Sequence, residues 1–564
     1  MVHPLRLTAP AVQKLPRWAL WAVMLMYALP GLFGRDPWRG DDATGFGIMW
    51  TMAGGDWHDW LLPNALGLGL LDPGPATYWP GAVVIAATEW LLPADEAARL
   101  AVLFQLGIAA AALWYSLYLL ARRADVQPQT MAFGGQPAPR DYGRAVADGG
   151  LLLSLATLGL LVNAHQTVME PFVLMASAGA AFGLIRALDK PWQGAWIFGL
   201  CIWLILLSLG VAAALVPVLV AFVLMLRAKD WRHLGWHWLV VALLVPAMLM
   251  SLWVMATDAI PGGNRYLAVW LEMQKPEWGW LRIETWWSYY LRNMPWFWWP
   301  LWPVALIAWW TWRRHDSAAV FALTRWWLAI GLVYLLLGRA PTQVSMVFLT
   351  PPLVLMAGLG LPVLKRGLAN LIDWFALLAF SVFAALIWLS WTATMTGWPP
   401  KIANNFAKLA PGYGFDFYPL YFAAALLATL WWAWVVSWRI SSRSVAVWRT
   451  AVLSSSGIAL VWCLFMTLHQ PYVNYLKSYR AVSAQLRAQV PANACIQADG
   501  LGHDERSSLA YLHDLRFGRS CDYLLQYLPD PESRLRVDKH WRVVWEGRRL
   551  KERGERFVLY QRHD

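Results

Sequence analysis

The segment LIDWFALLAFSVFAALIWLSW, residues 371–391, determines the fold class of this chain. It is almost wholly apolar, with Asp373 as its one charged side chain. A helix of about 20 apolar residues spans the hydrocarbon core of a bilayer. A second such segment, WLVVALLVPAMLMSLWVMA, covers residues 238–256. Segments of this length and character predict an all-α protein that crosses a membrane several times.

The composition of the whole chain agrees with this class. Of 564 residues, 59% are hydrophobic and 14% are charged, whereas about a quarter of a soluble protein is charged. The chain has 42 Trp residues, and indole favours the headgroup level at the ends of spans. The hydropathy pattern predicts thirteen spans: 17–34, 97–120, 149–164, 170–187, 192–207, 210–227, 235–257, 296–312, 324–338, 345–362, 371–393, 416–437 and 449–468.

The distribution of basic residues predicts the orientation. The net charge is +12, but the connections on one side of the predicted spans carry about twice as many Lys and Arg as those on the other. By the positive-inside rule the richer side, which includes the N-terminus, is cytoplasmic. An odd number of spans then places the C-terminus outside. Because the charge lies in connections between spans, it predicts contact with a lipid bilayer and no binding of nucleic acid.

The chain divides into a membrane domain, residues 1–469, and a soluble tail, residues 470–564. Within the first, residues 35–96 form a long outward loop. Two of its segments, 41–55 and 77–92, are predicted to be helices on the membrane surface. The second carries Pro80 and Glu89 and is too short for a comfortable span.

The tail is predicted to be a small α/β domain. Strands are expected at 494–499, 541–547 and 556–562, with a helix at 507–515. Cys495 and Cys521 fall in this outward domain, where an oxidising compartment favours a disulfide between them. Metal binding by this pair is the weaker alternative, because no CxxC or HxxxH spacing surrounds it.

Acidic residues at the outer surface are the first candidates for chemistry. Asp41 and Asp42 begin the first surface helix, where they could be a helix cap and a solvated neighbour. Directly after a span and beside helices that could roof a cavity, a carboxylate can instead serve as a general base. Glu170, in NAHQTVMEPF (163–172), lies at the outer boundary of the third and fourth spans, where ionisable groups usually face a polar cavity. The alternative for Glu170 is a simple N-terminal carboxylate of its helix.

Other polar residues could bind a substrate. Arg339, in the short loop GRAPTQ, and Arg265 are outward cations of the kind that bind phosphate, although snorkelling at the interface is the alternative. His165 could contact a ligand or simply a backbone carbonyl. Tyr78 and Tyr289 lie in the same outward segments and complete the predicted substrate-binding set.

At these residues the sequence resembles the membrane-embedded GT-C glycosyltransferases, in the branch of bacterial lipid A aminoarabinose transferase and protein O-mannosyltransferase-like (PMT-like) enzymes. Short motifs in the same order carry the resemblance over most of residues 30–365. They are RDPWRGDDATGFGIMWTMAGGDW (35–57), DPGPATYW (72–79), DEAARLAVLFQLGIAAAALWYSLYLLARR (95–123), HQTVMEPF (165–172), YYLRNMPWFWWPLWP (289–303) and GRAPTQVSMVFLTPPLVLMAGLGL (338–361).

The resemblance implies a multi-pass enzyme of the bacterial inner membrane, with its N-terminus in the cytoplasm and its C-terminus in the periplasm. Such enzymes move a sugar, with inversion, from a polyprenyl-phosphate carrier to a glycan, lipid or protein acceptor such as lipid A. The resemblance places Asp41 at the candidate catalytic acid and Glu170 at the second acid. No cofactor is required, and a divalent metal is possible but not indicated.

Two segments depart from the pattern of the relatives. Where relatives have Glu-Lys-Pro-Pro, this chain has Asp72-Pro73-Gly74-Pro75, and SLG (208–210) stands where they often show Lys-Gly. The lysine expected to meet the carrier phosphate is therefore missing, and Arg339 or Arg265 is the candidate replacement. Two alternative functions follow: a transporter or flippase for a lipid-linked glycan, or a catalytically silent relative that scaffolds an envelope assembly.

Overall fold

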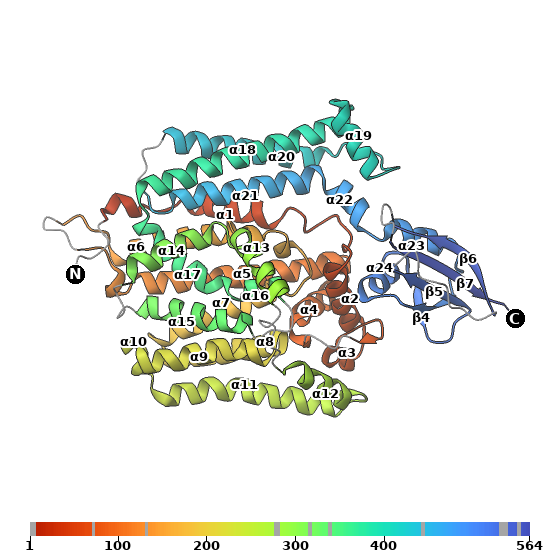
Figure 1. The fold of residues 1–564 in the computed structure, drawn as a ribbon, viewed down its shortest axis with the longest axis horizontal. Coiled ribbons are helices and arrows are strands. Elements are labelled where there is room, and N and C mark those ends of the chain that lie inside the picture. Colours follow the sequence, from red (N-terminus) through yellow and green to blue (C-terminus); the bar gives the residue numbers. More distant parts are fainter. Residues whose placement is uncertain are drawn as a thin grey trace.

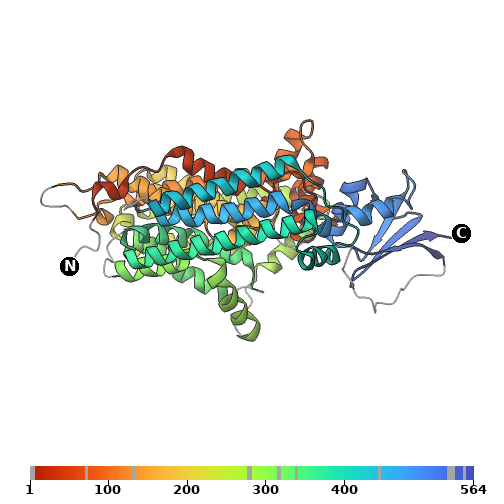
Figure 2. The ribbon, with the colours of Figure 1, turned by 90° about the horizontal axis from the view of Figure 1, so that it is seen from above.

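The computed structural model describes residues 7–69, 74–129, 134–275, 283–313, 319–336, 341–441, 446–529, 540–549 and 554–563. Long helices lie side by side with their axes roughly aligned, and a small α/β unit projects from one end of this bundle (Figure 1). The N-terminus lies at the opposite end. The view from above shows the same elongated arrangement (Figure 2).

The bundle contains helices of the length that a bilayer requires. Within the described ranges, seven helices are long and apolar enough to cross a membrane, or eight if one bent pair counts as a span. The seven are α5 (Ala94–Ala121), α7 (Glu170–Ala187), α8 (Pro191–Leu209), α11 (Gly235–Asp258), α18 (Arg366–Thr396), α20 (Pro419–Ser441) and α21 (Arg449–Leu468). Shorter helices in the remaining predicted spans are α1 (Arg17–Ala28), α9 (Val211–Arg227), α14 (Leu301–Trp312) and α15 (Ala319–Leu336). The protein is therefore a multi-pass membrane protein, and the number of thirteen crossings stays a prediction.

Three predicted spans are broken, which corrects their description as continuous helices. The span predicted at 149–164 is α6 (Pro139–Leu155) followed, after a 60° bend, by the short 3₁₀ turns η4 (Leu158–Leu160) and η5 (Asn163–His165). The span at 296–312 divides into α13 (Ile283–Phe297) and α14, and that at 345–362 into α16 (Gln343–Phe348), α17 (Thr350–Gly360) and η7 (Leu361–Val363).

The first of these breaks is closed by hydrogen bonds. The Leu158 N–H, which leaves the helix at the bend, donates to the Trp299 carbonyl at 3.0 Å. The Thr157 hydroxyl donates to the Leu153 carbonyl. Non-helical backbone at membrane depth is tolerated where protein covers and satisfies it. The break lets the chain continue as a loop before α7, in which the His165 carbonyl accepts a hydrogen bond from Arg35 and the His165 ring contacts the Tyr27 carbonyl of α1.

Helices of the outward segments gather at the end of the bundle that carries the α/β unit (Figure 1). They are α2 (Asp41–Gly54), α3 (Trp57–Leu61), α4 (Trp79–Thr88), α12 (Gly263–Met273), α19 (Pro400–Leu409) and α22 (Gln470–Lys477). The segment predicted as a second surface helix is α4, whose ten residues cannot span a bilayer. The predicted outward segments thus share one end of the molecule.

The α/β unit has a five-stranded sheet with strand order β4-β3-β5-β7-β6. The strands are β3 (Cys495–Asp499), β4 (Arg516–Gly518), β5 (Tyr523–Leu528), β6 (Trp541–Gly547) and β7 (Arg556–Arg562), and α23 (Arg480–Arg487) and α24 (His503–His513) pack on the sheet. Strands β3, β4 and β5 run parallel, and β7 is antiparallel to both of its neighbours. A disulfide joins Cys495 to Cys521, next to the β4 end.

The α/β unit is packed tightly against α2. The Tyr511 ring from α24 contacts Phe46 and Trp50 of α2, with ring centroids 4.7 and 5.3 Å apart. A Cβ atom at Gly47 would lie 1.8 Å from the Ser507 hydroxyl oxygen, so the two helices meet where α2 has no side chain. The first loop is therefore enclosed between the bundle and the α/β unit.

Candidate functional site

The start of α2 is fixed by the carboxylate of Asp42. Its Oδ2 accepts hydrogen bonds from Arg35 Nη1 at 2.7 Å and from the Trp38 N–H at 3.0 Å. Its Oδ1 accepts from the Thr167 N–H at 2.6 Å and from the Thr167 hydroxyl at 2.8 Å. Burial acts to raise the pKa of Asp42, but the charge of Arg35 and these hydrogen bonds outweigh it and hold the pKa below its ordinary value.

A glycine permits the close approach of α2 to the loop before α7. A Cβ atom at Gly45 would lie 1.8 Å from the Thr167 carbonyl oxygen, so no other residue fits without moving the backbone. Tyr78, at the start of α4, packs on the other side of Gly45 and is buried. The contacts at Asp42 and Gly45 together set the first turn of α2 against the start of α7.

Two buried arginines hold the chain that leads to α2. The Arg35 guanidinium donates to Asp42 and to the carbonyls of Gly31, Asp36 and His165. Arg99, from α5, donates to the carbonyls of Leu32 and Arg35 and pairs with Asp95 at 2.5 Å. Both guanidinium groups are buried, and they use their donors on backbone carbonyls and on the carboxylates of Asp42 and Asp95.

This arrangement brings Asp41 and Glu170 to the same place. Asp41 is exposed on the first turn of α2, and Glu170 begins α7. The two carboxylates are close enough to act on each other electrostatically. Asn163 Nδ2 contacts Glu170 Oε1 at 3.4 Å and Gln343 Oε1 at 3.3 Å. The sequence analysis paired the two acids but missed Asn163 and Gln343, which the break in α6 and the start of α16 bring beside them.

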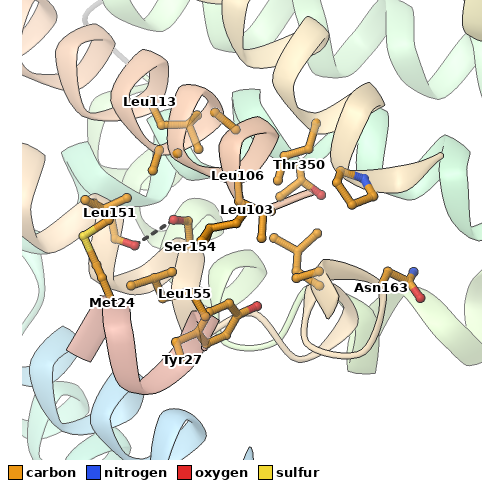
Figure 3. A pocket seen from close by; sticks show the side chains of 18 of the residues that line it. Met24, Tyr27, Leu103, Leu106, Leu113, Leu151, Ser154, Leu155, Asn163 and Thr350 are labelled. Atoms are coloured by element: carbon orange, nitrogen blue, oxygen red, sulfur yellow. Dashed lines mark hydrogen bonds between the residues drawn. The ribbon is translucent and has the colours of Figure 1, made fainter. Parts of the chain in front are cut away.

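An apolar cavity lies next to Glu170 and Asn163, and Figure 3 shows side chains that line it. Its volume is about 290 Å³, and side chains from α1, α5, α6, α7 and α17 line it. Glu170, Asn163 and Ser154 all belong to the lining. The Ser154 hydroxyl donates a hydrogen bond to the Leu151 carbonyl (Figure 3). Trp21 and Leu25, on the lipid-exposed face of α1, form another part of the wall. The cavity thus joins a carboxylate to a surface that faces lipid.

The predicted substrate-binding residues do not all gather here. His165 is buried with its two ring nitrogens 2.7 Å from the Leu161 and Tyr27 carbonyl oxygens, so its ring contacts backbone and does not line the cavity. Arg265 is exposed on α12, and no contact within the described ranges joins it to Asp41 or Glu170. Arg339 lies outside the described residues.

Tyr289 is the predicted residue that does approach the acid pair. Its side chain is partly buried on α13, and burial together with the charge of Glu170 raises its pKa. A tyrosine hydroxyl is protonated at neutral pH with or without this shift, so Tyr289 can donate a hydrogen bond.

The two segments that depart from the GT-C pattern lie in contact with each other. A Cβ atom at Gly74 would lie 2.3 Å from the Leu207 carbonyl oxygen, at the end of α8 and directly before Ser208. Asp72 and Pro73 are outside the described residues. Glycine permits this close backbone packing between the two segments.

The α/β unit reaches the same loop from the other side. Arg480 pairs with Asp36 at 2.5 Å, and the Ser478 hydroxyl donates to the same carboxylate at 2.6 Å. Burial acts to raise the pKa of Asp36, but these two partners hold it below its ordinary value. The Gly40 N–H, one residue before Asp41, donates to Asp504 Oδ2 at 2.8 Å. A search of the described residues finds no group of three or more His, Cys, Asp or Glu side chains that could hold a metal ion.

Comparisons with known proteins support the fold. No protein-family model matches the sequence. The structure is similar to that of ArnT from Cupriavidus metallidurans bound to undecaprenyl phosphate, with a TM-score of 0.65 and 16% identity over 96% of this chain and 97% of that one. The apo form of the same ArnT gives a TM-score of 0.64 at 15% identity, with the same coverage. The chain therefore has the fold of the ArnT structures over nearly its whole length, as the resemblance in its sequence predicts.

Proposed function

We propose that this protein is an integral-membrane glycosyltransferase of the GT-C type. It transfers a sugar from a polyprenyl-phosphate carrier to an acceptor at the non-cytoplasmic face of the bacterial inner membrane. The observation that carries the proposal is Glu170 in the lining of a lipid-facing apolar cavity, with Asp41 close enough for its charge to act on that carboxyl. The fold shared with an ArnT that binds undecaprenyl phosphate supports the choice of carrier.

In this proposal Asp41 is the general base. Its carboxylate is exposed, and no described residue makes a hydrogen bond or ion pair with it, so both oxygens can accept a proton from an acceptor hydroxyl or amine. The acceptor atom forms a bond to the anomeric carbon while the bond from that carbon to the carrier phosphate breaks. The electron pair leaves with the phosphate, the proton goes to Asp41, and the configuration inverts.

Glu170, Asn163 and Tyr289 orient the reacting sugar. A carboxylate and an amide at the cavity mouth can accept and donate hydrogen bonds to sugar hydroxyls, and the protonated Tyr289 hydroxyl adds a donor. Asp42 acts by position, because its oxygens are already shared among four donors. Outward arginines, Arg265 and Arg339, are the proposed partners of the departing phosphate in place of the missing lysine.

The cavity would hold part of one lipid chain. Its volume is near the lower end of the range for small-molecule sites, and its wall is almost entirely apolar. With a chain in the cavity, the headgroup of that lipid lies beside Glu170, at the depth where α2 presents Asp41. Binding and chemistry would thus meet at one point.

Transfer from radiolabelled undecaprenyl-phosphate sugars to membrane extract tests the proposal. Asp41→Asn should lower kcat by about 10²- to 10⁴-fold, the contribution of a general base, and leave binding of undecaprenyl phosphate unchanged. Asp56→Asn is the matched control, because Asp56 is an exposed acid just beyond the far end of the same helix. Full activity of Asp41→Asn would remove the assigned base. Movement of labelled lipid across proteoliposomes without any transfer would favour a flippase instead.

A further inference from the structure

The contact between the α/β unit and the first loop contains a pair of adjacent carboxyl groups, Asp504 and Glu505. Both stand in the first turn of α24, and their side chains lie close enough to interact. Asp504 Oδ1 and Glu505 Oε2 converge on Gly502, since a Cβ atom there would lie 3.3 and 2.6 Å from them. Two carboxyl groups can share a hydrogen bond only if one of them carries a proton.

The surroundings favour that proton. Glu505 is 6% exposed, and its Oε2 has no hydrogen-bond donor in the described structure. The Tyr479 hydroxyl lies 3.2 Å from Asp504 Oδ2 and 3.3 Å from Glu505 Oε1. Because it has one proton, it can donate a good hydrogen bond to only one of these two oxygens. Burial, followed by the hydrogen bond and the charge of Asp504, raises the pKa of the Glu505 carboxyl to about 8. Because the two groups are coupled, the proton belongs to the pair.

The charged groups that face the pair nearly balance it. Tyr527 faces it from β5, and Arg549 stacks on the Tyr479 ring at 4.7 Å. Arg549 also pairs with Glu555 at 2.5 Å, and Arg39 of the first loop reaches the same carboxylate at 3.5 Å. Among the described residues, this cluster thus contains three carboxyl groups and two guanidinium groups. They are those of Asp504, Glu505, Glu555, Arg39 and Arg549. One proton on the acid pair makes the cluster neutral, and its loss leaves a buried negative charge.

The pair is joined directly to the turn that presents Asp41. Asp504 Oδ2, which contacts Tyr479, also accepts the hydrogen bond from the Gly40 N–H. Gly40 has a φ of +82°, which a residue with a side chain rarely adopts, and Asp41 follows it as the first residue of α2. A shift of Asp504 therefore changes the backbone on which Asp41 stands.

We propose that Asp504 and Glu505 are positioning residues that share one proton and hold the Gly40–Asp41 turn against the α/β unit while that proton is present. The direction of the pH dependence follows from the linkage between proton binding and docking. The first loop covers the start of α24 through the Gly40–Asp504 hydrogen bond and the close approach of Gly47 to Ser507, so docking adds to the burial that raises the pKa of the Glu505 carboxyl. The part of the shift that comes from docking stabilises the docked state fully at acidic pH, and this contribution is lost as the pH rises towards 8. Deprotonation places two like charges in contact, the start of α24 moves, and the Gly40 N–H loses its acceptor.

Hydrogen–deuterium exchange on the full-length protein in detergent tests this without any substrate. The protection of residues 38–46, corrected for the chemical exchange rate, should fall by about tenfold for each pH unit between 6 and 8, the slope of one proton. Glu505→Gln, whose neutral amide can donate to Asp504, should remove this slope and keep the protection at pH 8. Glu546→Gln, on the exposed strand β6, is the matched control and should behave as wild type.

A flat wild-type profile, or the same slope in Glu505→Gln, would overturn the proposal. If Glu505→Gln fails to fold, infrared spectroscopy of the wild type at pH 7 and 9 replaces it, and a protonated carboxyl band that persists unchanged at pH 9 would also overturn it. The consequence for catalysis rests on the proposed function: kcat should stay constant while the docked fraction is near one and fall only at the higher pH where undocking becomes substantial, with KM for the donor unchanged. Since exchange requires no transfer, failure of the glycosyltransferase assignment and failure of the proton pair remain distinguishable.

Discussion

Asp41 and Asp42 are neighbours in the chain, yet they lie in opposite surroundings. Asp42 is buried, and its two oxygens are shared by Arg35, Trp38 and Thr167. Asp41 is exposed and faces Glu170, near a cavity whose wall is apolar. The saturated region around Asp42 fixes geometry and leaves no acceptor for a substrate. In the open region, the Asp41 carboxylate oxygens can still accept hydrogen bonds from a substrate. The contacts of Asp42 fix the position of this region.

Replacing each aspartate by alanine in turn should show the largest difference between the two regions. Asp42→Ala leaves the Arg35 guanidinium buried without its carboxylate, which should destabilise the protein by about 3–5 kcal/mol. Asp41→Ala should cost less than about 1 kcal/mol, because an exposed first-turn acid contributes little to a helix. Apparent melting temperatures in detergent measure the difference. Equal losses in the two variants would contradict the division between the regions.

Gly45→Ala tests whether the two regions depend on one contact. The new methyl group would overlap the Thr167 carbonyl, and such overpacking costs about 1–3 kcal/mol. Because α2 must move away from the loop before α7, transfer should fall together with thermal stability. Gly54→Ala is the control in the same helix, since its Cβ would meet nothing within 4 Å. A fully active, stable Gly45→Ala would show that the close approach is dispensable.

Hydropathy and charge were enough to predict much of the fold. Long apolar segments gave α5, α11 and α18, and the short length of 77–92 gave the surface helix α4. The break in α6 could not be predicted, because residues 149–164 carry no charge and no proline, and the carbonyl that closes the break belongs to Trp299, far along the chain. In the tail, the segment YLLQYL (523–528) contains no β-branched residue, so its composition fits a helix as well as a strand. Strand β5 was therefore not predicted from the sequence.

The site was predictable only as a pair of acids. Order along the chain placed Asp41, Asp42 and Glu170 at the outer surface. Order alone could not distinguish Asp41 from Asp42, and only the resemblance singled out Asp41, because their different surroundings arise from Arg35 and from Thr167, which lies 125 residues from Asp42. Asn163 carries no signal of its own in the sequence, because only the bend after α6 turns it towards Glu170.

Gly107→Leu should affect only the open region. Gly107 lines the cavity from α5, and a Cβ there would meet nothing within 4 Å, so the leucine enters the space without a clash. Binding of undecaprenyl phosphate should weaken about tenfold, whereas thermal stability should stay the same or rise, because glycine is a poor helix former. Gly367→Leu, at an equally open position of α18, is the control. Unchanged binding in Gly107→Leu would show that the lipid chain lies elsewhere.

Asn163→Ala should give the smallest effect, again confined to the open region. The hydrogen bonds of Asn163 to Glu170 and Gln343 are long, 3.4 and 3.3 Å, and a neutral bond contributes about 0.5–1.5 kcal/mol. Transfer should therefore fall about three- to tenfold, with no change in melting temperature. Asn404→Ala, on the exposed face of α19, should leave both quantities unchanged. Asn163→Asp should be more harmful than Asn163→Ala, because it adds a third negative charge beside Asp41 and Glu170. If instead Asn163→Ala lowered stability as much as Asp42→Ala, Asn163 would belong to the saturated region, and the boundary between the two would have to be drawn at Glu170 alone.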